Sequence, residues 1–329
     1  MSYILVTGGS GYVGSQTNLA LVESGFQTVI FDAKKPKIES IWPPNQAFVQ
    51  GNLMNSEDLK QLFEHYKIDA VLHFAAYIEA RESQSDPQKY YYNNVAGTLN
   101  LLFAMREAGV DKIIFSSTAA VYGFPETVPI LETAVKNPVS TYGQTKLIIE
   151  QILTDYHRAY GLSSFCLRYF NAAGGDGLGR TGEMHEPETH LIPIILEVLS
   201  GERDSITVFG DDYKTQDGTC VRDYIHTQDL AAAHVLALKK LLSSDSICDY
   251  INLATKRGYS VKEIIAAVER VTGIPVKYSI GQRKSGDPDF LVADNTKAGE
   301  ILGWQPQYSN IDNIVRTAWQ WKQKVRGEL

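Results

Sequence analysis

A glycine-rich segment close to the start of the chain restricts the possible folds more than any other feature. The segment Gly8-Gly9-Ser10-Gly11-Tyr12-Val13-Gly14 connects an apolar run to a helical pattern. Glycines allow a sharp turn, a close approach of phosphate groups to the backbone and tight packing of a helix on a strand. The helix N-terminus then offers amide donors to an anion. We interpret the segment as the strand–loop–helix unit of a dinucleotide site; the simpler alternative is a tight turn without a ligand.

An acidic residue farther along favours the dinucleotide interpretation. Asp32 ends the second apolar run, 18 residues after Gly14. A carboxylate at this position accepts hydrogen bonds from both hydroxyls of an adenine ribose, and it repels a 2′-phosphate. The two features together therefore predict NAD, rather than NADP, as the cofactor.

Short β-branched or aromatic runs alternate with longer helical patterns through the first half of the chain, which is typical of βα units. The expected strands are Tyr3–Thr7, Thr28–Phe31, Ala47–Gln50, Ala70–Phe74, Ile113–Ser117 and Ser164–Tyr169. The expected helices are Val13–Ser24, Glu57–Tyr66, Pro87–Ala108 and Tyr142–Tyr160. Several strands are apolar throughout, as in a sheet covered on both faces. The pattern predicts an α/β fold with a doubly wound parallel sheet.

The pattern changes after Asn171, where a glycine-rich turn spans residues 174–179. Later elements are shorter and less regular: Leu191–Leu199, Ile206–Phe209, Asp229–Leu242 and Val261–Val271. We therefore expect two domains. The first comprises residues 1–171, joined by part of 220–250, and the second is a smaller mixed α/β domain built mainly from residues 172–329.

Composition excludes several classes of partner. Hydrophobic residues make up 44% and charged residues 21%, and no uncharged apolar run approaches the ~20 residues of a membrane span. The net charge of −7 comes without a basic stripe, which disfavours nucleic acid and anionic membranes as partners. Cys166, Cys220 and Cys248 show neither disulfide nor metal spacing, and no basic leader precedes the first apolar run. We therefore expect a cytoplasmic protein.

Tyr142 and Lys146 form a second chemical signal. Residues four apart share one face of a helix, so the ammonium group can favour the ionised phenol. A free phenol titrates near ~10, so a base at neutral pH needs a shift of about three units, or roughly 4 kcal/mol. The pair is common by chance and gains its value from the dinucleotide signal in the same chain.

Ser116, Ser117 and Thr118 follow a buried-looking strand, where hydroxyls orient a substrate or simply cap a turn.

One loop is rich in residue types that bind metals: Glu183, His185, Glu186, Glu188 and His190. Their spacing along the chain matches no compact metal site. We therefore expect this segment to be a loop that holds no metal.

These features together resemble the extended short-chain dehydrogenase/reductase superfamily, and more closely the UDP-glucose 4-epimerase family, over nearly the whole chain. Further matching segments are residues 73–76 (HFAA), 92–98 (YNNVAGT), 167–171 (LRYFN) and 219–226 (TCVRDYIH). The resemblance implies a Rossmann-like NAD-binding domain followed by a domain that binds a UDP-sugar.

The resemblance also implies roles for individual residues. The implied cofactor contacts are Gly8, Gly11, Tyr12, Val13, Gly14, Asp32, Asn52, Leu53, Phe74, Ala75, Ala76, Asn94, Ser116, Tyr142, Lys146, Tyr169 and Phe170. The implied substrate contacts are Thr118, Tyr142, Asn171, His190, Leu191, Thr207, Phe209, Arg222 and Asp287. The implied catalytic residues are Tyr142, Lys146 and Thr118.

Some positions depart from the family pattern. Asn52 stands where an aspartate is common, Lys284 where an arginine binds phosphate, Ile78 where some members have a lysine, and Thr118 where a serine is frequent. Leu291 falls where the family limits the room for an N-acetyl group, which leaves the preferred sugar open. Arg81 and Glu82 match no known role.

The predicted activity is the interconversion of UDP-glucose and UDP-galactose by transient oxidation at C4, with Tyr142 as the base. The alternatives are a 4-epimerase of UDP-GlcNAc, UDP-xylose or UDP-glucuronate, and a binding protein that has lost catalysis. A 4,6-dehydratase carries two carboxylates after the equivalent threonine, whereas here Thr118 is followed by Ala119 and Ala120. A homodimer through the long helices at Pro87–Ala108 and Tyr142–Tyr160 is the expected assembly.

Overall fold

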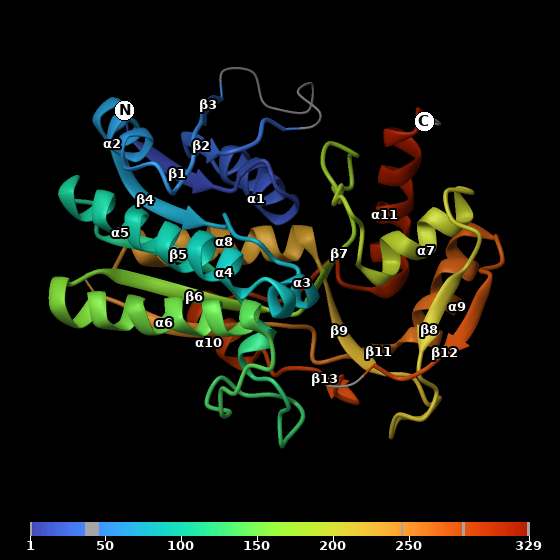
Figure 1. Cartoon of the computed structure of the whole chain (residues 1–329). Helices are drawn as coiled ribbons and strands as arrows, with labels where there is room; N and C mark the ends of the chain where they lie inside the picture. The colour runs from blue at the N-terminus through green and yellow to red at the C-terminus, as the bar shows by residue number, and fades with distance from the viewer. Residues whose placement is uncertain (1, 37–45, 245, 285–286, 328–329) are drawn as a thin grey trace.

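A seven-stranded parallel sheet forms the centre of the larger lobe (Figure 1). The computed structural model describes residues 2–36, 46–244, 246–284 and 287–327. In sheet order the strands are β10 (Cys248–Leu253), β6 (Ser163–Tyr169), β5 (Lys112–Thr118), β4 (Ile68–His73), β1 (Tyr3–Thr7), β2 (Thr28–Asp32) and β3 (Ala47–Gln50). This order, with helices on both faces, confirms the predicted doubly wound, Rossmann-like sheet.

Side chains that alternate along each strand enter two separate cores. Ile4 and Val6 pack on one face with α1 (Tyr12–Glu23), α8 (Thr227–Leu242) and α10 (Thr296–Leu302). Leu5, between them, packs on the other face with α2 (Ser56–His65), α5 (Gly97–Glu107) and α6 (Thr141–Tyr160). Both sets are buried, which explains the continuous apolar runs in the sequence.

The single helix expected over Pro87–Ala108 is divided into three segments, so the prediction is wrong in its detail. The segments are α4 (Pro87–Tyr90), a π-helical stretch η2 (Tyr91–Ala96) and α5. The wider π turns bring Asn94 inward, where its side chain is buried and bonds to both backbone groups of Tyr77 (2.8 and 3.0 Å). π-helical turns of this kind are frequent at functional sites.

The smaller lobe has its own sheets and core. Its four-stranded sheet contains β7 (Asn171–Ala173), β9 (Val221–His226), β11 (Gly258–Ser260) and β13 (Phe290–Leu291), and a two-stranded sheet pairs β8 (Ile206–Phe209) with β12 (Tyr278–Gly281). The helices α7 (Leu191–Leu199), α9 (Val261–Thr272) and α11 (Ile311–Val325) cover a separate apolar core. Figure 1 shows this lobe beside the carboxyl ends of the central strands.

Three elements of the C-terminal half belong to the larger lobe in space, one of them being α10, which packs against β10 and α8. β10 pairs with β6 from Cys248 to Leu253, and α8 packs on the sheet beside α1. A buried ion pair, between Glu150 of α6 and Arg168 of β6 (2.5 Å), ties helix to strand at this side of the sheet. None of the helices in the described ranges is long and apolar enough to cross a membrane.

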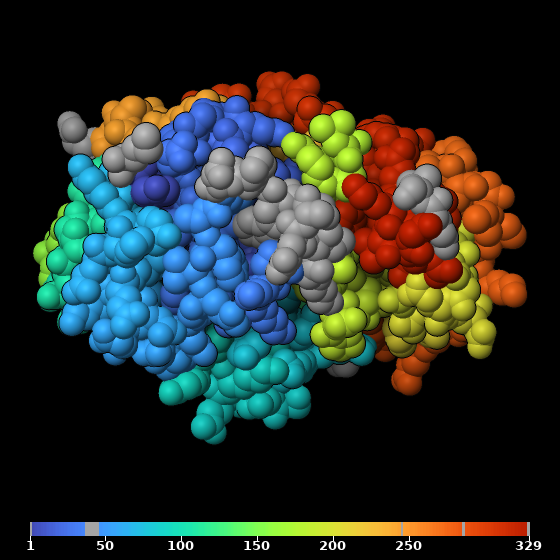
Figure 2. All heavy atoms as spheres, turned by 90° about the horizontal axis from the view of Figure 1, so that it is seen from above, coloured from blue at the N-terminus to red at the C-terminus, as the bar shows by residue number. Residues whose placement is uncertain are grey.

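The loop between β7 and α7 lies at the junction of the lobes. Figure 2 shows this yellow-green segment between the blue N-terminal residues and the red C-terminal helix. Thr181 bonds to Ser15 of α1 (2.6 Å), while the indole nitrogen of Trp321 in α11 donates to the carbonyl of Glu183 (3.0 Å). The loop therefore joins the glycine-rich segment to the smaller lobe.

Candidate active site

The glycine-rich segment lies where the strand order of the sheet reverses. The chain passes from β1 outward to β2 and β3, then returns to β4 on the other side of β1. Gly8 has a φ of +70°, and a Cβ there would lie 2.5 Å from the backbone nitrogen of Ala75, just after β4. Only glycine fits this contact, which places the loop at the position where such sheets bind their ligands.

The same loop has the properties of an anion cradle. A Cβ on Gly14 would lie 2.3 Å from the carbonyl oxygen of Gly8. Helix α1 begins without a capping side chain or an acidic residue in its first turn, so its amides are open to an anion. Within the described part of the chain, the Ser10 hydroxyl oxygen is buried with no hydrogen-bond partner. Asp32 accepts from the backbone N–H of Ser10 (3.0 Å) and holds the loop against the end of β2.

Other predicted cofactor residues surround this loop from neighbouring strands. Tyr12 uses its phenol to bond the carbonyl of Gly174, so only its backbone faces the anion cradle. The side chain of Asn52 accepts from the backbone N–H of Met54 (2.9 Å) and shapes the turn after β3, which holds the buried Leu53. Val13 lies in the first turn of α1, and Ala76 follows Ala75 in the segment after β4.

An aromatic group lies beside the ends of β4 and β6. The ring of Phe74 lies 4.8 Å from that of His234, and the phenol of Tyr169 bonds to the Ser116 hydroxyl. Phe170, directly after β6, packs against a small apolar cluster that includes Tyr122. These side chains form an apolar wall next to the hydroxyls of β5 and suit the flat ring of a dinucleotide.

Tyr142, Thr118 and Lys146 meet at the carboxyl end of β5. Ser140 caps helix α6 by accepting from the backbone N–H of Gly143 (3.1 Å), which sets the orientation of Tyr142 in the first turn. The Tyr142 phenol forms a hydrogen bond with the Thr118 side chain. The ammonium group of Lys146 donates to the carbonyl of Ser116 (2.7 Å) and lies 5.9 Å from the centre of the Tyr142 ring.

Burial changes the pKa values of both ionisable members of this trio, Tyr142 and Lys146. Burial raises the pKa of Tyr142 to about 12; the hydrogen bond from Thr118 opposes the shift and the nearby charge of Glu79 adds to it. Burial also lowers the pKa of Lys146 to about 7, with Glu150 opposing this shift. Burial therefore disfavours the charged forms of both side chains in the chain by itself, and the expectation that Lys146 together with an oxidised nicotinamide ring keeps the phenol ionised stays a prediction.

Sequence reasoning missed residues that support the trio. Ser83 of α3 (Ala80–Ser85) accepts from the backbone N–H of Tyr142 (3.0 Å). Glu150, four residues after Lys146 on the same face of α6, accepts from the Ser117 hydroxyl (2.6 Å). A glutamate continuing the Tyr142–Lys146 spacing on an otherwise apolar helix face was the available signal.

The predicted nucleotide end of the substrate site lies in the smaller lobe. Arg222 forms an ion pair with Asp287, which also accepts from the Tyr213 phenol (2.8 Å). Thr207 and Phe209 lie on β8, with Phe209 exposed at the strand end. Asn171 begins β7 and Leu191 begins α7.

Two cations gather over the Phe209 ring. The ammonium nitrogen of Lys284 lies 3.9 Å from the ring centre, and the guanidinium carbon of Arg81 lies 5.9 Å from it. Arg81 comes from α3 of the larger lobe, so the sequence offered no reason to place it here. Burial lowers the pKa of Lys284, and the like charge of Arg81 lowers it further. An anion between the lobes would relieve this repulsion.

His190 sits in the loop of metal-ligand residue types, and that loop is compact. Its imidazole Nδ1 contacts carboxylate oxygens of Glu183 (2.8 Å) and Glu188 (2.9 Å). The expectation that these residues are too scattered for a metal site is wrong in its premise, because the chain folds back between them. Burial lowers the pKa of His190, but the hydrogen bonds that its imidazole donates to both glutamates outweigh this effect and raise the value to about 10.

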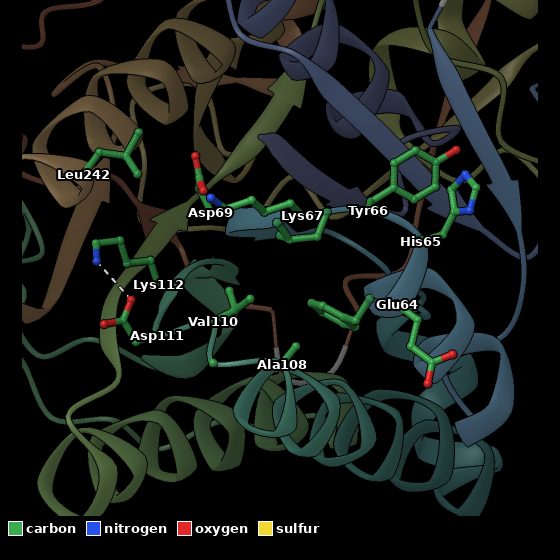
Figure 3. Close-up of a pocket in the computed structure, with 13 residues that line it drawn as sticks. Glu64, His65, Tyr66, Lys67, Asp69, Ala108, Val110, Asp111, Lys112 and Leu242 are labelled. Atoms are coloured by element: carbon green, nitrogen blue, oxygen red, sulfur yellow. Dashed lines mark hydrogen bonds and ion pairs between the residues drawn. The ribbon is translucent and has the colours of Figure 1, made fainter. Parts of the chain in front are cut away.

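A separate hollow of about 720 Å³ lies at the opposite ends of the central strands, near the amino ends of β4 and β5 (Figure 3). Tyr66, Lys67, Asp69 and Lys112 line it, and Lys112 is paired there with Asp111 (2.9 Å). None of its lining residues was predicted to bind cofactor or substrate. The predicted cofactor-binding and catalytic residues lie instead at the carboxyl ends of the central strands.

Comparison with known proteins agrees with this geometry. A family model described as GDP-mannose 4,6 dehydratase matches residues 5–317. A UDP-glucose 4-epimerase of Lactobacillus helveticus is 45% identical over 318 residues, which cover 97% of this chain and 96% of that protein. The crystal structure of UDP-glucose 4-epimerase from Brucella ovis in complex with NAD has a TM-score of 0.93 at 45% identity, covering 97% of this chain and 98% of that one. The enzyme from Bifidobacterium longum in complex with NAD+ and UDP has a TM-score of 0.94 at 36% identity, with full coverage of both chains.

Proposed function

Because the chain belongs to the UDP-glucose 4-epimerase family, we propose that it is an isomerase that interconverts UDP-glucose and UDP-galactose with NAD as its cofactor. The single observation that carries the reaction is the meeting of Tyr142, Thr118 and Lys146 at the carboxyl end of β5, two strands away from the strand that leads into the glycine-rich loop. The substrate is a small nucleotide sugar, and neither nucleic acid nor a membrane is a partner.

Cofactor binding is assigned to the larger lobe. Residues 1–171, together with α8 and β10, form the NAD-binding domain, and mainly residues 172–329 form the UDP-sugar domain. Gly8, Gly11 and Gly14 let the pyrophosphate approach the backbone, since a side chain at Gly8 or Gly14 would strike backbone atoms. Asp32 holds the adenine ribose, with the Asn52 turn near the adenine. The wall of Phe74, Ala75 and Tyr169 receives the nicotinamide, and Asn94, which is bonded to the backbone of Tyr77, also contacts the cofactor.

Proton transfer is assigned to the catalytic trio. When bound, NAD+ would supply the hydride acceptor and, in its reduced form, the hydride donor for C4 of the sugar, and its oxidised ring would supply a positive charge. Tyr142 accepts the proton of the C4 hydroxyl at its phenol oxygen and later returns it. Thr118, bonded to the same phenol, orients that hydroxyl. Lys146, anchored on the Ser116 carbonyl, adds its charge when protonated.

Substrate binding concentrates on the nucleotide end. Thr207 and Phe209 contact the uracil, and Arg222 with Asp287 holds the nucleotide. Asn171, His190 and Leu191 approach the diphosphate. A guanidinium can contact two phosphate oxygens at once, which supports Arg222 in this role. The residues assigned to tight binding contact the UDP and lie away from the sugar carbon C4. The sugar can therefore rotate between the two hydride transfers while the UDP stays in place.

A dehydratase reaction is disfavoured by the segment after Thr118. Ala119 and Ala120 form a short 3-10 turn there, and Thr118 accepts from the backbone N–H of Ala120 (3.2 Å). Two alanines provide no acid or base for the elimination of water, although the family model bears a dehydratase description.

A direct assay tests the proposed reaction. Purified protein is incubated with UDP-galactose, and the sugar nucleotides are separated; UDP-glucose is the expected product, without net consumption of NAD. Tyr142→Phe should retain bound NAD and lose nearly all turnover, whereas Tyr278→Phe, an exposed phenol on β12, should retain both. A protein that carries NAD but forms no UDP-glucose would refute the proposal. Parallel incubation with UDP-GlcNAc tests the room around Leu291.

A homodimer is proposed through α5 and α6. Leu99 and Phe103 on α5 and Tyr160 at the end of α6 are large apolar residues with 38%, 59% and 55% exposure. An exposed apolar face of this kind is covered by a second apolar surface. In a dimer with two-fold symmetry, the same face of the second copy provides that surface. Phe103→Glu should shift the molecular mass measured by light scattering from dimer to monomer.

The three free cysteines support a reducing compartment, and we propose the cytoplasm.

A further inference from the structure

Four potential metal ligands meet in the loop between β7 and α7. Glu183, His185, Glu188 and His190, here named the Glu/His cluster, each offer one ligand atom, and these atoms all lie within 4.8 Å of one another. The proposed reaction at Tyr142 uses none of the cluster's carboxylates. His190 is assigned to the diphosphate of the substrate, but the proposed function gives no role to Glu183, His185 or Glu188, so the cluster as a whole needs an explanation of its own.

The ligand atoms face one common point. Nδ1 of His185 lies 3.0 Å from Oε1 of Glu183, and Nδ1 of His190 lies 2.8 Å from the same oxygen. Nδ1 of His190 also lies 2.9 Å from Oε1 of Glu188. The two imidazole rings are 5.1 Å apart, centre to centre. Two nitrogens and two carboxylate oxygens thus converge, and a cation could replace the protons that bridge them.

We propose that the Glu/His cluster binds one divalent first-row transition ion of the zinc type. Imidazole nitrogen with carboxylate oxygen is a donor set that Zn²⁺ accepts, whereas Mg²⁺ and Ca²⁺ take oxygen ligands. Zinc holds such ligands at about 2.0–2.1 Å, so neighbouring ligand atoms of a tetrahedral site lie roughly 3.3 Å apart. The contacts of 2.8–3.0 Å widen slightly to reach this value. The wider separations close by movement of the more exposed imidazoles.

The surroundings of the two carboxylates favour a cation. The side chains of Glu183 and Glu188 are only 8% exposed, and the ion-pair partners found for them in the described residues are the two imidazoles. Two carboxylates so close together in a dry position require positive charge. A divalent ion supplies both charges at one point. His185 and His190, at 28% and 40% exposure, leave a path for the ion to enter.

Hydrogen bonds and a ring contact with residues outside the cluster hold the Glu/His cluster in place. Oε1 of Glu188 accepts from the backbone N–H groups of Thr189 (2.7 Å) and His190 (2.8 Å). The ring of His185 lies edge-on to that of Tyr12, 6.1 Å away, next to the glycine-rich loop. Thr189 bonds to Glu79, just before α3 of the larger lobe (3.0 Å). A bound ion would therefore tie the glycine-rich loop, α3 and the start of α7 together, and it would position His190.

Calorimetric titration of the whole 329-residue chain, without an affinity tag, tests the site. The protein is first dialysed against a chelator and then titrated separately with Zn²⁺, Mn²⁺ and Mg²⁺. We expect saturable binding of one Zn²⁺ per chain, and weaker or no binding of Mg²⁺. Glu183→Gln and His185→Asn remove direct ligands, so each should weaken zinc binding by more than the roughly 10–100-fold that losing an outer-shell partner causes. Glu186→Gln, an exposed carboxylate of the same loop outside the cluster, is the matched control and should bind zinc like the wild type.

Each alternative outcome overturns the assignment. If no transition ion binds the wild-type chain with a saturable signal, the cluster is a hydrogen-bonded network without a metal. If zinc binds equally to the wild type and to Glu183→Gln, the ion sits elsewhere, for example at one of the free cysteines. Should the variants fail to fold, the visible spectrum of the Co²⁺-loaded wild type still decides, because thiolate ligands give intense charge-transfer bands that nitrogen and oxygen ligands do not.

Discussion

The ionisation of the Tyr142 phenol should depend on the oxidation state of the cofactor. In the chain alone, burial raises the pKa of this phenol to about 12, with Glu79 adding to the shift and Thr118 opposing it. Lys146, whose pKa burial lowers to about 7, is largely uncharged in alkaline solution. For Tyr142 to act as the proposed base at neutral pH, most of the missing positive charge would have to come from the oxidised nicotinamide.

The size of the effect follows from Coulomb's law. For the phenol to titrate at neutral pH, its pKa must fall by about five units from the value of about 12. This fall corresponds to roughly 7 kcal/mol of additional stabilisation of the phenolate. A positive charge about 4 Å from the phenolate contributes ~4 kcal/mol at an effective dielectric constant of ~20, or about three units. The oxidised ring alone should thus bring the pKa of Tyr142 down to about 9. The remainder must come from Lys146, which is protonated more fully once the phenolate has formed.

Phenolate absorbance measures this directly. The wild type and Tyr142→Phe are titrated from neutral to alkaline pH without cofactor, with NAD+ and with NADH, and the difference between the two proteins isolates one phenol. We expect its titration at about pH 9 or below with NAD+, and close to 12 without cofactor or with the uncharged NADH ring. Turnover should fall as the pH drops below the NAD+-loaded value, because a base must be deprotonated to accept a proton. Tyr122, a buried phenol whose pKa burial also raises to about 12, should not respond to the cofactor.

One result would refute the reasoning. If the Tyr142 signal stays near pH 12 with NAD+ bound while the protein epimerises its substrate at neutral pH, this phenol is not the base. The electrostatic argument would also be wrong if NADH lowered the pKa as much as NAD+, because the uncharged ring lacks the charge on which it depends.

Three further substitutions test the cofactor loop, the core and the substrate site. Gly14→Ala places a Cβ 2.3 Å from a backbone oxygen, so the roughly 1–3 kcal/mol of overpacking should weaken NAD binding about tenfold or more in a fluorescence titration, while Gly299→Ala, with its nearest atom at 3.7 Å, should not. Glu150→Gln leaves the guanidinium of Arg168 buried without its charge partner, so the free energy of unfolding measured in urea should fall by about 3–5 kcal/mol. Arg81→Ala removes a cation from the Phe209 ring, so KM for the nucleotide sugar should rise about tenfold, with little change in kcat.

The contradictory outcomes are equally specific. Normal NAD affinity in Gly14→Ala would mean that the loop relaxes without losing its ligand geometry. For the buried pair, the exposed pair of Lys60 and Glu64 is the control, and its loss should change stability by less than about 1 kcal/mol. If Glu150→Gln has an equally small effect, water reaches the guanidinium. A fall in kcat with unchanged KM in Arg81→Ala would place Arg81 near the reacting carbon.

Much of the fold could be predicted because its signals are local. β-branched runs, glycine turns and helix caps act over a few residues, so strands such as Tyr3–Thr7 and Ile206–Phe209 agree with the expectation. The π-helical stretch at Tyr91–Ala96 was not predictable, because its sequence is an ordinary helix pattern and the contacts of Asn94 come from distant residues. β10 was also missed, since only its pairing with β6 distinguishes it from a short surface strand.

The candidate site divides in the same way. The spacing of Gly8, Gly11 and Gly14 carries its own chemistry, because steric limits on the backbone act at each glycine whatever the rest of the chain does. The spacing of Tyr142 and Lys146 also requires only one helix. The charge state of that phenol is different: it depends on burial and on Glu79, which approaches from another segment.

Local signals along the chain were therefore enough to predict the glycine-rich loop, the alternation of strands and helices and the tyrosine–lysine helix, because their physics operates between residues close in sequence. Folding in three dimensions was needed to bring Arg81 over Phe209 from the other lobe and to gather Glu183, His185 and His190 around one point. Electrostatic energies depend on distance through space and on exclusion of water, and neither quantity exists until the chain has folded.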